Sequence, residues 1–148
     1  MNKKKRQGVV YMIIGLSLFL FVVIFSFFSP ASTTMIHIGG DTYNLEVLKT
    51  SGEREKGLSG RSSLPRDQGL LFVFNELGMY GFWMKEMNFP ISIIWLDQNC
   101  TVTGFVREAL PSSYPEVFYP EKESLFVVEV NPLAQEISIG ETLLCDFE

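Results

Sequence analysis

The 148-residue chain has few of the side chains on which most active-site chemistry depends. His37 is its only histidine, and Cys100 and Cys145 are its only cysteines. It has no Cys-x-x-Cys pair, no cluster of cysteine with histidine and no glycine-rich phosphate loop. Zinc sites and histidine-assisted nucleophiles need such groups. We therefore expect no metal, no cofactor and no assignable catalytic residue.

Charge is absent from the twenty residues that run from Val9 to Phe28. Three lysines and an arginine precede this run at residues 3–6. Twenty helical residues at ~1.5 Å each span the ~30 Å core of a bilayer, and a basic flank stays in the cytoplasm. The sequence thus predicts a single-pass protein of the cell membrane, with a cytoplasmic basic tail (1–8), a transmembrane signal-anchor helix (9–28), a linker (29–34) and an extracytoplasmic β domain (35–148).

A cleaved signal peptide is the alternative to an anchor. Ser29 and Ala31 are small residues at a plausible cleavage spacing. However, the apolar run exceeds the usual ~7–15 residues of a signal peptide, and Pro30 lies inside the would-be cleavage site. We favour an uncleaved anchor in the lipid bilayer. Both interpretations place the domain outside the cytoplasm.

Negative charge is concentrated after the predicted anchor. The chain has 12 Lys and Arg, 17 Asp and Glu, and a net charge of −5. Four of the basic residues and none of the acidic ones precede residue 9, so the remainder carries eight positive against 17 negative charges. An acidic domain repels phosphate backbones. We therefore expect no nucleic-acid partner.

Period-two patterns and turn residues predict short strands. Apolar residues alternate with polar ones on both sides of a Gly-Gly-Asp turn between residues 36 and 47, which is typical of a hairpin. Residues 69–74, 91–96 and 125–130 are short apolar runs typical of buried strands. The pattern predicts a mainly β fold, an antiparallel β sandwich or barrel with one short helix, preceded by one N-terminal transmembrane helix.

The connecting segments are also distinctive. Residues 51–57 predict the short helix, with Ser51 as its cap and Gly57 at its end. Asp97 follows a strand and is expected to form a turn. Residues 109–124 contain three prolines and predict a long loop, and long loops are often functional.

Four segments in defined order carry a recognisable pattern: residues 53–58 (EREKGL) followed by Arg61, 69–74 (GLLFVF), 82–85 (FWMK) and 90–97. In order and spacing they resemble the family called domain of unknown function 192, over roughly residues 35–147. The resemblance implies a mostly β domain, and a membrane-anchored member would fit the tail. It implies no activity.

The chain departs from the pattern of that family at three places. Ser59 replaces a methionine, Glu86-Met87 replaces Asn-Thr, and Ile91-Ser92 replaces Leu-Asp. The last change removes a carboxylate. A family site that used this carboxylate would be altered here.

Two arginines and a Trp-Lys pair are candidate ligand-binding residues. Arg54 and Arg61 are seven residues apart, close to two helical turns, and could hold an anionic group or pair with surface carboxylates. Trp83 and Lys85 would share one face of a strand. Trp83 could be a platform for a sugar, peptide or cation, or it could cap the core while Lys85 extends past it.

Glu129 is the candidate with the most unusual setting, because it lies inside an apolar strand. A buried carboxylate is costly unless it is paired, and Arg61 or Lys85 are the expected partners. A perturbed general base would have the same sequence signature. Tyr119, with Tyr114 in the same proline-rich loop, could close over a groove.

Cys100 and Cys145 are a candidate disulfide, because paired cysteines outside the cytoplasm usually bond. The closed loop would stabilise the fold by roughly 4 kcal/mol in the entropy model. Two unrelated small apolar residues are the alternative.

Taken together, the residues favour a membrane-tethered, non-catalytic module that binds a small ligand, glycan or protein partner outside the cytoplasm. The first alternative is an enzyme that uses Arg61, Lys85 and Glu129 on a small polar or glycan substrate. The second is a structural partner of another membrane complex. The enzyme needs its three residues to converge around one cavity.

Overall fold

The computed structural model describes residues 11–12, 14, 17 and 32–147. The predicted basic tail (1–8), most of the predicted transmembrane segment (9–28) and residues 29–31 of the predicted linker (29–34) therefore lie outside the described residues. The linker prediction was wrong at its end, because Thr33 and Thr34 already belong to the first strand. Within the described part of the chain, no helix has the length and apolar character needed to cross a membrane. Ser32–Glu148 forms one compact unit.

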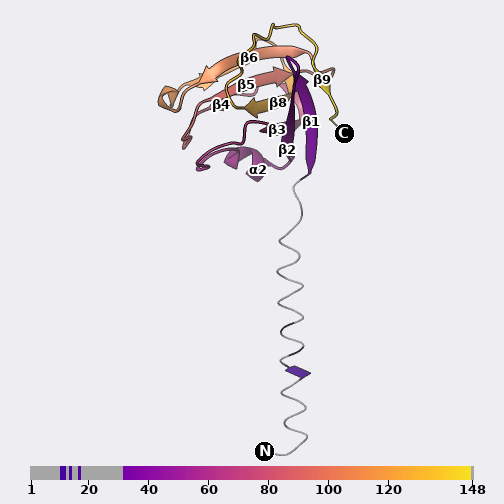
Figure 1. Cartoon of the computed structure of the whole chain (residues 1–148), viewed down its shortest axis with the longest axis vertical. Coiled ribbons are helices and arrows are strands. Elements are labelled where there is room, and N and C mark those ends of the chain that lie inside the picture. Colours follow the sequence, from indigo (N-terminus) through magenta and orange to yellow (C-terminus); the bar gives the residue numbers. More distant parts are fainter. Residues whose placement is uncertain (1–10, 13, 15–16, 18–31, 148) are drawn as a thin grey trace, which may run out of the picture. The chain divides into compact units, whose positions relative to one another are not determined.

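The domain is built on one curled sheet of seven strands (Figure 1). Neighbouring strands follow the order β6-β5-β8-β3-β2-β1-β9. The prediction of a mainly β domain with one short α-helix is confirmed for the described residues. The strands are β1 (Thr33–Ile38), β2 (Asp41–Leu48), β3 (Gln68–Gly78), β5 (Ile91–Leu96), β6 (Val102–Ala109), β8 (Ser124–Val130) and β9 (Leu144–Cys145).

The sheet is mixed, so the prediction of a purely antiparallel arrangement was wrong. Strands β2 and β3 run parallel, with Val47 opposite Leu71, while the other neighbours in the sheet are antiparallel. Parallel neighbours need a crossover connection rather than a tight turn. Residues 49–67 supply it and include the helix α2 (Ser51–Lys56). Local periodicity carries no information on this pairing, because it reports which face a residue occupies and not which strand lies beside it.

The described residues also contain a small second sheet. It pairs β4 (Phe82–Trp83) with β7 (Val117–Phe118). Strand β7 belongs to the proline-rich segment that was predicted as a loop, which also contains the short 3-10 helix η1 (Pro111–Ser113). This pairing fastens the loop to the segment that carries Trp83.

Helix α2 begins with a capping box, one residue earlier than predicted. Thr50, not Ser51, is the N-cap: its hydroxyl accepts a hydrogen bond from the amide of Glu53 at 3.3 Å. The carboxylate of Glu53 accepts a hydrogen bond from the amide of Thr50 at 2.8 Å. These bonds lower the pKa of Glu53. A six-residue helix with no buried residue depends on such contacts.

The two faces of the sheet carry separate hydrophobic cores. Along β8, Val128 faces one core and Val127 the other, as the period of two requires. The first core includes Ile36, Ile38, Leu45, Leu71, Ile94, Leu96, Val128 and Val130. The second core includes Leu48, Leu58, Leu70, Phe72, Met84, Ile93, Trp95 and Val127.

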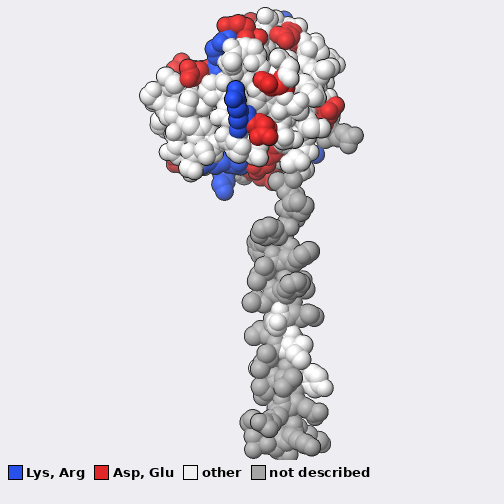
Figure 2. Space-filling model, in the orientation of Figure 1, with Lys and Arg blue, Asp and Glu red and all other residues white. Residues whose placement is uncertain are grey.

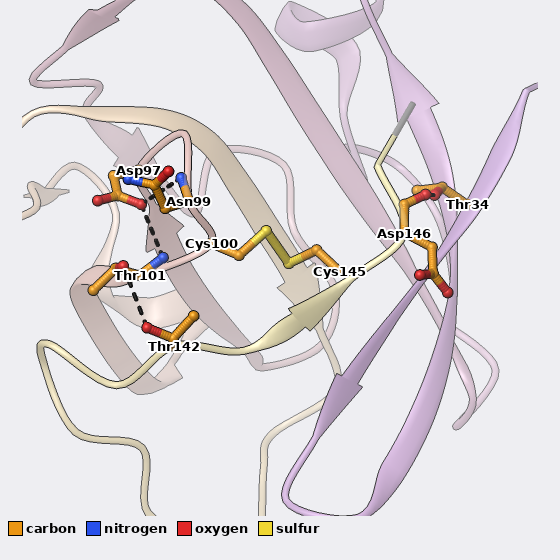
Figure 3. Close-up of a disulfide and its surroundings, with 8 residues drawn as sticks. All are labelled: Thr34, Asp97, Asn99, Cys100, Thr101, Thr142, Cys145 and Asp146. Atoms are coloured by element: carbon orange, nitrogen blue, oxygen red, sulfur yellow. Dashed lines mark hydrogen bonds between the residues drawn. A yellow bond between two sulfur atoms is a disulfide. The ribbon is translucent and has the colours of Figure 1, made fainter.

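Cys100 and Cys145 are joined in a disulfide that links the turn after β5 to β9 (Figure 3). Their Cα atoms are 6.4 Å apart, within the range of a disulfide. The prediction of a turn at Asp97 is confirmed, since its carboxylate accepts hydrogen bonds from the amides of Asn99 at 2.8 Å and Thr101 at 2.9 Å. Together these contacts close the edge of the first core.

Candidate functional site

Glu129 is the one acidic residue in the described core, and it points to the second core. Strand β8 places it between Leu70 of β3 and Ile93 of β5, its neighbours across the sheet. Both neighbours are fully buried, and Glu129 itself is 6% exposed. The prediction of an inward carboxyl group in an apolar strand is therefore confirmed.

The carboxyl group of Glu129 has no ion-pair partner among the described residues. Its Oε2 atom is buried and has no hydrogen-bond partner there. Burial raises the pKa of Glu129 to about 8, and the positive charge of Arg61 offsets only part of this shift. The group is thus mostly protonated at neutral pH, when it can both donate and accept a hydrogen bond.

Glu129 lines a cavity of about 250 Å³. Five aromatic side chains contribute to the wall, and the remaining lining residues come mostly from α2 and the turn that follows it. The aromatic residues are Phe72, Phe74, Tyr80, Phe82 and Trp83, and the others are Arg54, Glu55, Lys56, Gly57, Leu58, Ser59, Gly81 and Met87.

The aromatic wall is held by ring contacts. Phe74 stacks on Tyr80 with ring centroids 3.5 Å apart, and Phe72 meets Phe82 edge to face at 4.8 Å. Trp95, beneath them, donates an indole hydrogen bond to the Tyr80 carbonyl at 2.8 Å. Such packing fixes the shape of the cavity before any ligand binds.

Arg54 lies at the same cavity and is fixed by its own contacts. Its Nη1 atom donates hydrogen bonds to the carbonyls of Lys49 at 2.5 Å and Val73 at 3.0 Å. Its guanidinium carbon lies 5.0 Å from the centroid of the Phe74 ring, a cation–π distance. Arg54 is therefore a positioned part of the wall.

Trp83 and Lys85 point outward, as the predicted alternation requires. Phe82 is half-buried and Met84 is 1% exposed, while Trp83 is 55% exposed and Lys85 is exposed. Trp83 lines the Glu129 cavity as well as a neighbouring pocket. Lys85 lines the neighbouring pocket but not the Glu129 cavity. The structure thus brings Trp83, and not Lys85, to Glu129.

Arg61 is not paired with Glu129, so the expected direct ion pair is wrong. Its Nη2 atom lies 2.7 Å from Oε2 of Glu46 on β2, and both side chains are about one-third exposed. Arg61 and Arg54 line different pockets. The two arginines therefore do not form a joint anion site. Their spacing of seven residues would place them on one face of a continuous helix, but α2 ends at Lys56, before Arg61.

Tyr119 lies beside the cavity rather than in its wall. It is 60% exposed. A methyl group added at Gly81 would come within 2.7 Å of the Tyr119 ring, so this ring covers a residue that lines the cavity. Tyr114, in the same loop, is 49% exposed. Neither tyrosine closes over Glu129.

The structure adds wall residues that the sequence reasoning missed. Phe72 and Phe74 share the face of Glu129, and their alternation in residues 69–74 was the available signal. Tyr80 and Gly81 had no comparable signal. In the described part of the chain, no three cysteine, histidine, aspartate or glutamate side chains are grouped as a metal site requires.

Charge on the domain surface offers no competing site in the face shown in Figure 2. Acidic and basic side chains are interspersed there, with wide uncharged areas between them. His37 is the single histidine. Its Nδ1 atom lies 2.9 Å from the hydroxyl of Thr42 on the neighbouring strand, so it takes part in a hydrogen bond between strands. The Glu129 cavity is therefore the best-defined candidate site.

Residues 34–143 match the model of DUF192, described as an uncharacterized ACR family. This chain belongs to the DUF192 family. The match spans most of the chain, and the earlier resemblance is confirmed. The family has no assigned function, so the function of this DUF192 member has to be argued from its own site.

Two crystal structures resemble this DUF192 chain. A proposed transcription regulator from Sinorhizobium meliloti 1021 has 25% identity and a TM-score of 0.63, covering 76% of this chain and 91% of that protein. A protein of unknown function from Novosphingobium aromaticivorans has 27% identity and a TM-score of 0.60, covering 68% and 73% respectively. No curated protein matches the chain significantly.

Ser92, which stands where the family pattern has an aspartate, has a structural role in this chain. Ser92 is fully buried and lies on β5, where its hydroxyl donates to the carbonyl of Arg107 and accepts from the amide of Leu133, the latter at 2.9 Å. It is not among the residues that line the Glu129 cavity. This departure therefore lies outside the candidate site, whereas Ser59 and Met87, at the other two departures, are among its lining residues.

Proposed function

We propose that this chain is a membrane-tethered module that binds a small ligand outside the cytoplasm, in the cavity lined by Glu129, Trp83 and Arg54. The observation that carries the proposal is the buried carboxyl group with an unsatisfied oxygen at a hollow in the surface. Buried polar groups are normally hydrogen-bonded, and an unsatisfied one costs about 1–3 kcal/mol. A ligand group that bonds to Glu129 would recover this cost.

Binding is favoured over catalysis because the three residues of the enzyme alternative do not converge. Arg61 pairs with Glu46, and Lys85 lines a different pocket from Glu129. A raised pKa suits a general acid, but one carboxyl group without a second reactive group is an incomplete catalytic site. The rigid aromatic wall is instead typical of a binding site.

The tether and the location are supported by the sequence and by the cysteines. The uncharged run from Val9 to Phe28 with its basic flank has the length and polarity of a signal anchor. The Cys100–Cys145 disulfide favours an oxidising compartment, because disulfides are rare in the cytosol. An external protease that removes a C-terminal tag from cells expressing the full chain would support this location. The proposed location would be contradicted if the tag stayed protected from the protease, even after the outer layers of the cell envelope were made permeable, and if the chain were recovered as a soluble cytosolic protein.

Ligand binding can be followed through the two tryptophans. The full chain in lipid nanodiscs, labelled with 5-fluorotryptophan, has two 19F resonances, one from exposed Trp83 and one from buried Trp95. We expect members of a fragment library of neutral, cationic and anionic compounds to shift the Trp83 resonance in a saturable way. Glu129→Leu should abolish these shifts, and Glu116→Gln, at an exposed carboxylate, should keep them.

Two results would contradict the binding proposal. One is a library in which no compound shifts the Trp83 resonance. The other is a set of shifts that persists unchanged in Glu129→Leu, since the ligand would then bind elsewhere.

A further inference from the structure

We infer, on the basis of the proposed binding function, that the cavity takes an uncharged pyranose sugar, with a ring hydroxyl hydrogen-bonded to Glu129 and an apolar ring face on Trp83. The inference starts from the unpartnered Oε2 atom of Glu129, which is more than nine-tenths buried and lines the cavity. A sugar hydroxyl can donate to this oxygen and accept from a protonated carboxyl group.

The charges around the cavity disfavour a charged ligand. Arg54 and Lys56 line the same cavity, and Arg61 acts on Glu129 from nearby, so an ammonium group would meet three positive charges. An anion would approach the carboxylate of Glu55, and Nη1 of Arg54 is already engaged by two backbone carbonyls. A neutral group that carries hydroxyls avoids both conflicts.

The wall and the size of the cavity fit a single ring. Trp83 is the largest exposed aromatic of the wall, and the pairing of β4 with β7 holds its backbone. Indole faces bury apolar C–H surface at low entropic cost and leave polar groups free to bond. The volume of about 250 Å³ is smaller than most sites for drug-sized ligands, which indicates one ring rather than a long chain inside the cavity.

The test uses the full chain in nanodiscs with 19F detection at Trp83. The probes are glucose, galactose, mannose and N-acetylglucosamine, each as the free sugar and as the terminal residue of an oligosaccharide. Methylammonium, tetramethylammonium, acetate and phosphate are the charged comparisons. We expect at least one sugar to bind in a saturable way and more tightly than every charged probe.

Variants of Glu129 and Trp83 separate a hydroxyl ligand from a cation. Glu129→Gln keeps a donor and an acceptor without charge, so sugar affinity should change by less than about tenfold, whereas Glu129→Leu should weaken it by about tenfold or more. Trp83→Ala should weaken sugar binding by a similar factor, measured by isothermal titration calorimetry because this variant has no Trp83 resonance. An unchanged Trp95 resonance in the Glu129 variants is the control for correct folding.

Each outcome decides a part of the proposal. Binding of free sugars alone identifies a soluble sugar as the ligand, and binding of oligosaccharide ends alone identifies a glycan terminus. If library fragments bind at Glu129 but no sugar does, or if a charged probe binds more tightly than every sugar, the sugar inference is overturned while the binding function stands. If neither fragments nor sugars bind, both are overturned.

Discussion

The two faces of β8 differ in a way that separates stability from function. On one face, Val128 and Val130 pack into the first core, where the disulfide closes the edge. On the other face, Val127 packs into the second core, but Glu129 lines a cavity, and its Oε2 atom has no hydrogen-bond partner among the described residues. One strand therefore contributes aliphatic packing on one side and a costly polar group on the other.

The Glu129 face of β8 therefore carries an energetic cost that the Val128 face lacks. An aliphatic residue at position 129 would fill the site without a desolvation penalty. Local violations of this kind are expected where function requires them. Among the described residues, no buried side-chain atom without a hydrogen-bond partner belongs to the first core, and we interpret this core as the stabilising half of the domain.

The largest predicted effect comes from opening the edge of the first core. Replacing both cysteines (Cys100→Ser with Cys145→Ser) removes a link across 45 positions, which should lower the free energy of unfolding by about 4 kcal/mol. Urea unfolding of both proteins measures the change, and the free energy of unfolding of the double variant should not respond to reductant. A loss below about 1 kcal/mol would remove the assignment of the first core as the stabilising half.

The next effect is a dependence of stability on pH that originates in the second core. Between the ordinary pKa of 4.5 and the raised pKa of about 8, folded Glu129 keeps a proton that the unfolded chain has lost. The contribution of Glu129 to the free energy of unfolding is therefore fully present below pH 4.5. It falls as pH rises toward 8, by at most about 1.4 kcal/mol per pH unit. Urea midpoints at pH 5, 6, 7 and 8 measure the slope.

Two glutamate variants isolate the source of this slope. Glu129→Gln should remove the contribution and leave a flatter profile, because the amide does not titrate. Glu116→Gln, at an exposed carboxylate, should keep the slope of the original protein. Equal slopes for all three proteins would show that Glu129 is not the source of the pH dependence. The proposed difference between the two cores would then be wrong.

The smallest effect is expected at the surface pair near the second core. Arg61 and Glu46 are partly exposed, so Glu46→Gln should cost about 0.2–1 kcal/mol. Arg61→Met should cost a similar amount and should also raise the pKa of Glu129, because the positive charge of Arg61 favours its ionised form. Urea unfolding and carboxyl NMR measure the two quantities. A loss of several kcal/mol in either variant would mean that this pair belongs to the core.

Much of the fold follows from local patterns in the sequence. The apolar runs predicted the central strands β5 and β8, and period two predicted the β1–β2 hairpin and the opposite directions of Trp83 and Met84. The inward direction of Glu129 was predictable for the same reason. Each of these properties depends on neighbours close in sequence, and sequence patterns report such neighbours well.

Properties set by distant parts of the chain were not predictable. The parallel pairing of β2 with β3, the partner of Arg61 and the β4–β7 pairing each depend on how segments meet in space. The cavity depends on Tyr80 and Gly81, which come from a turn without a distinctive pattern. The sequence therefore indicated the key carboxyl group but assigned it the wrong partner.

The role of Glu129 as an unpaired, buried carboxyl group at the binding cavity is tested most directly by a measurement of its pKa. The full chain in nanodiscs, labelled with 13C at glutamate carboxyl groups, gives a titration curve for each glutamate, and Glu129→Gln identifies the relevant signal. We expect a midpoint near 8, because the carboxyl group is buried without a partner among the described residues. A midpoint near 4.5 would show that the group is solvated or paired, and would contradict the site proposed here.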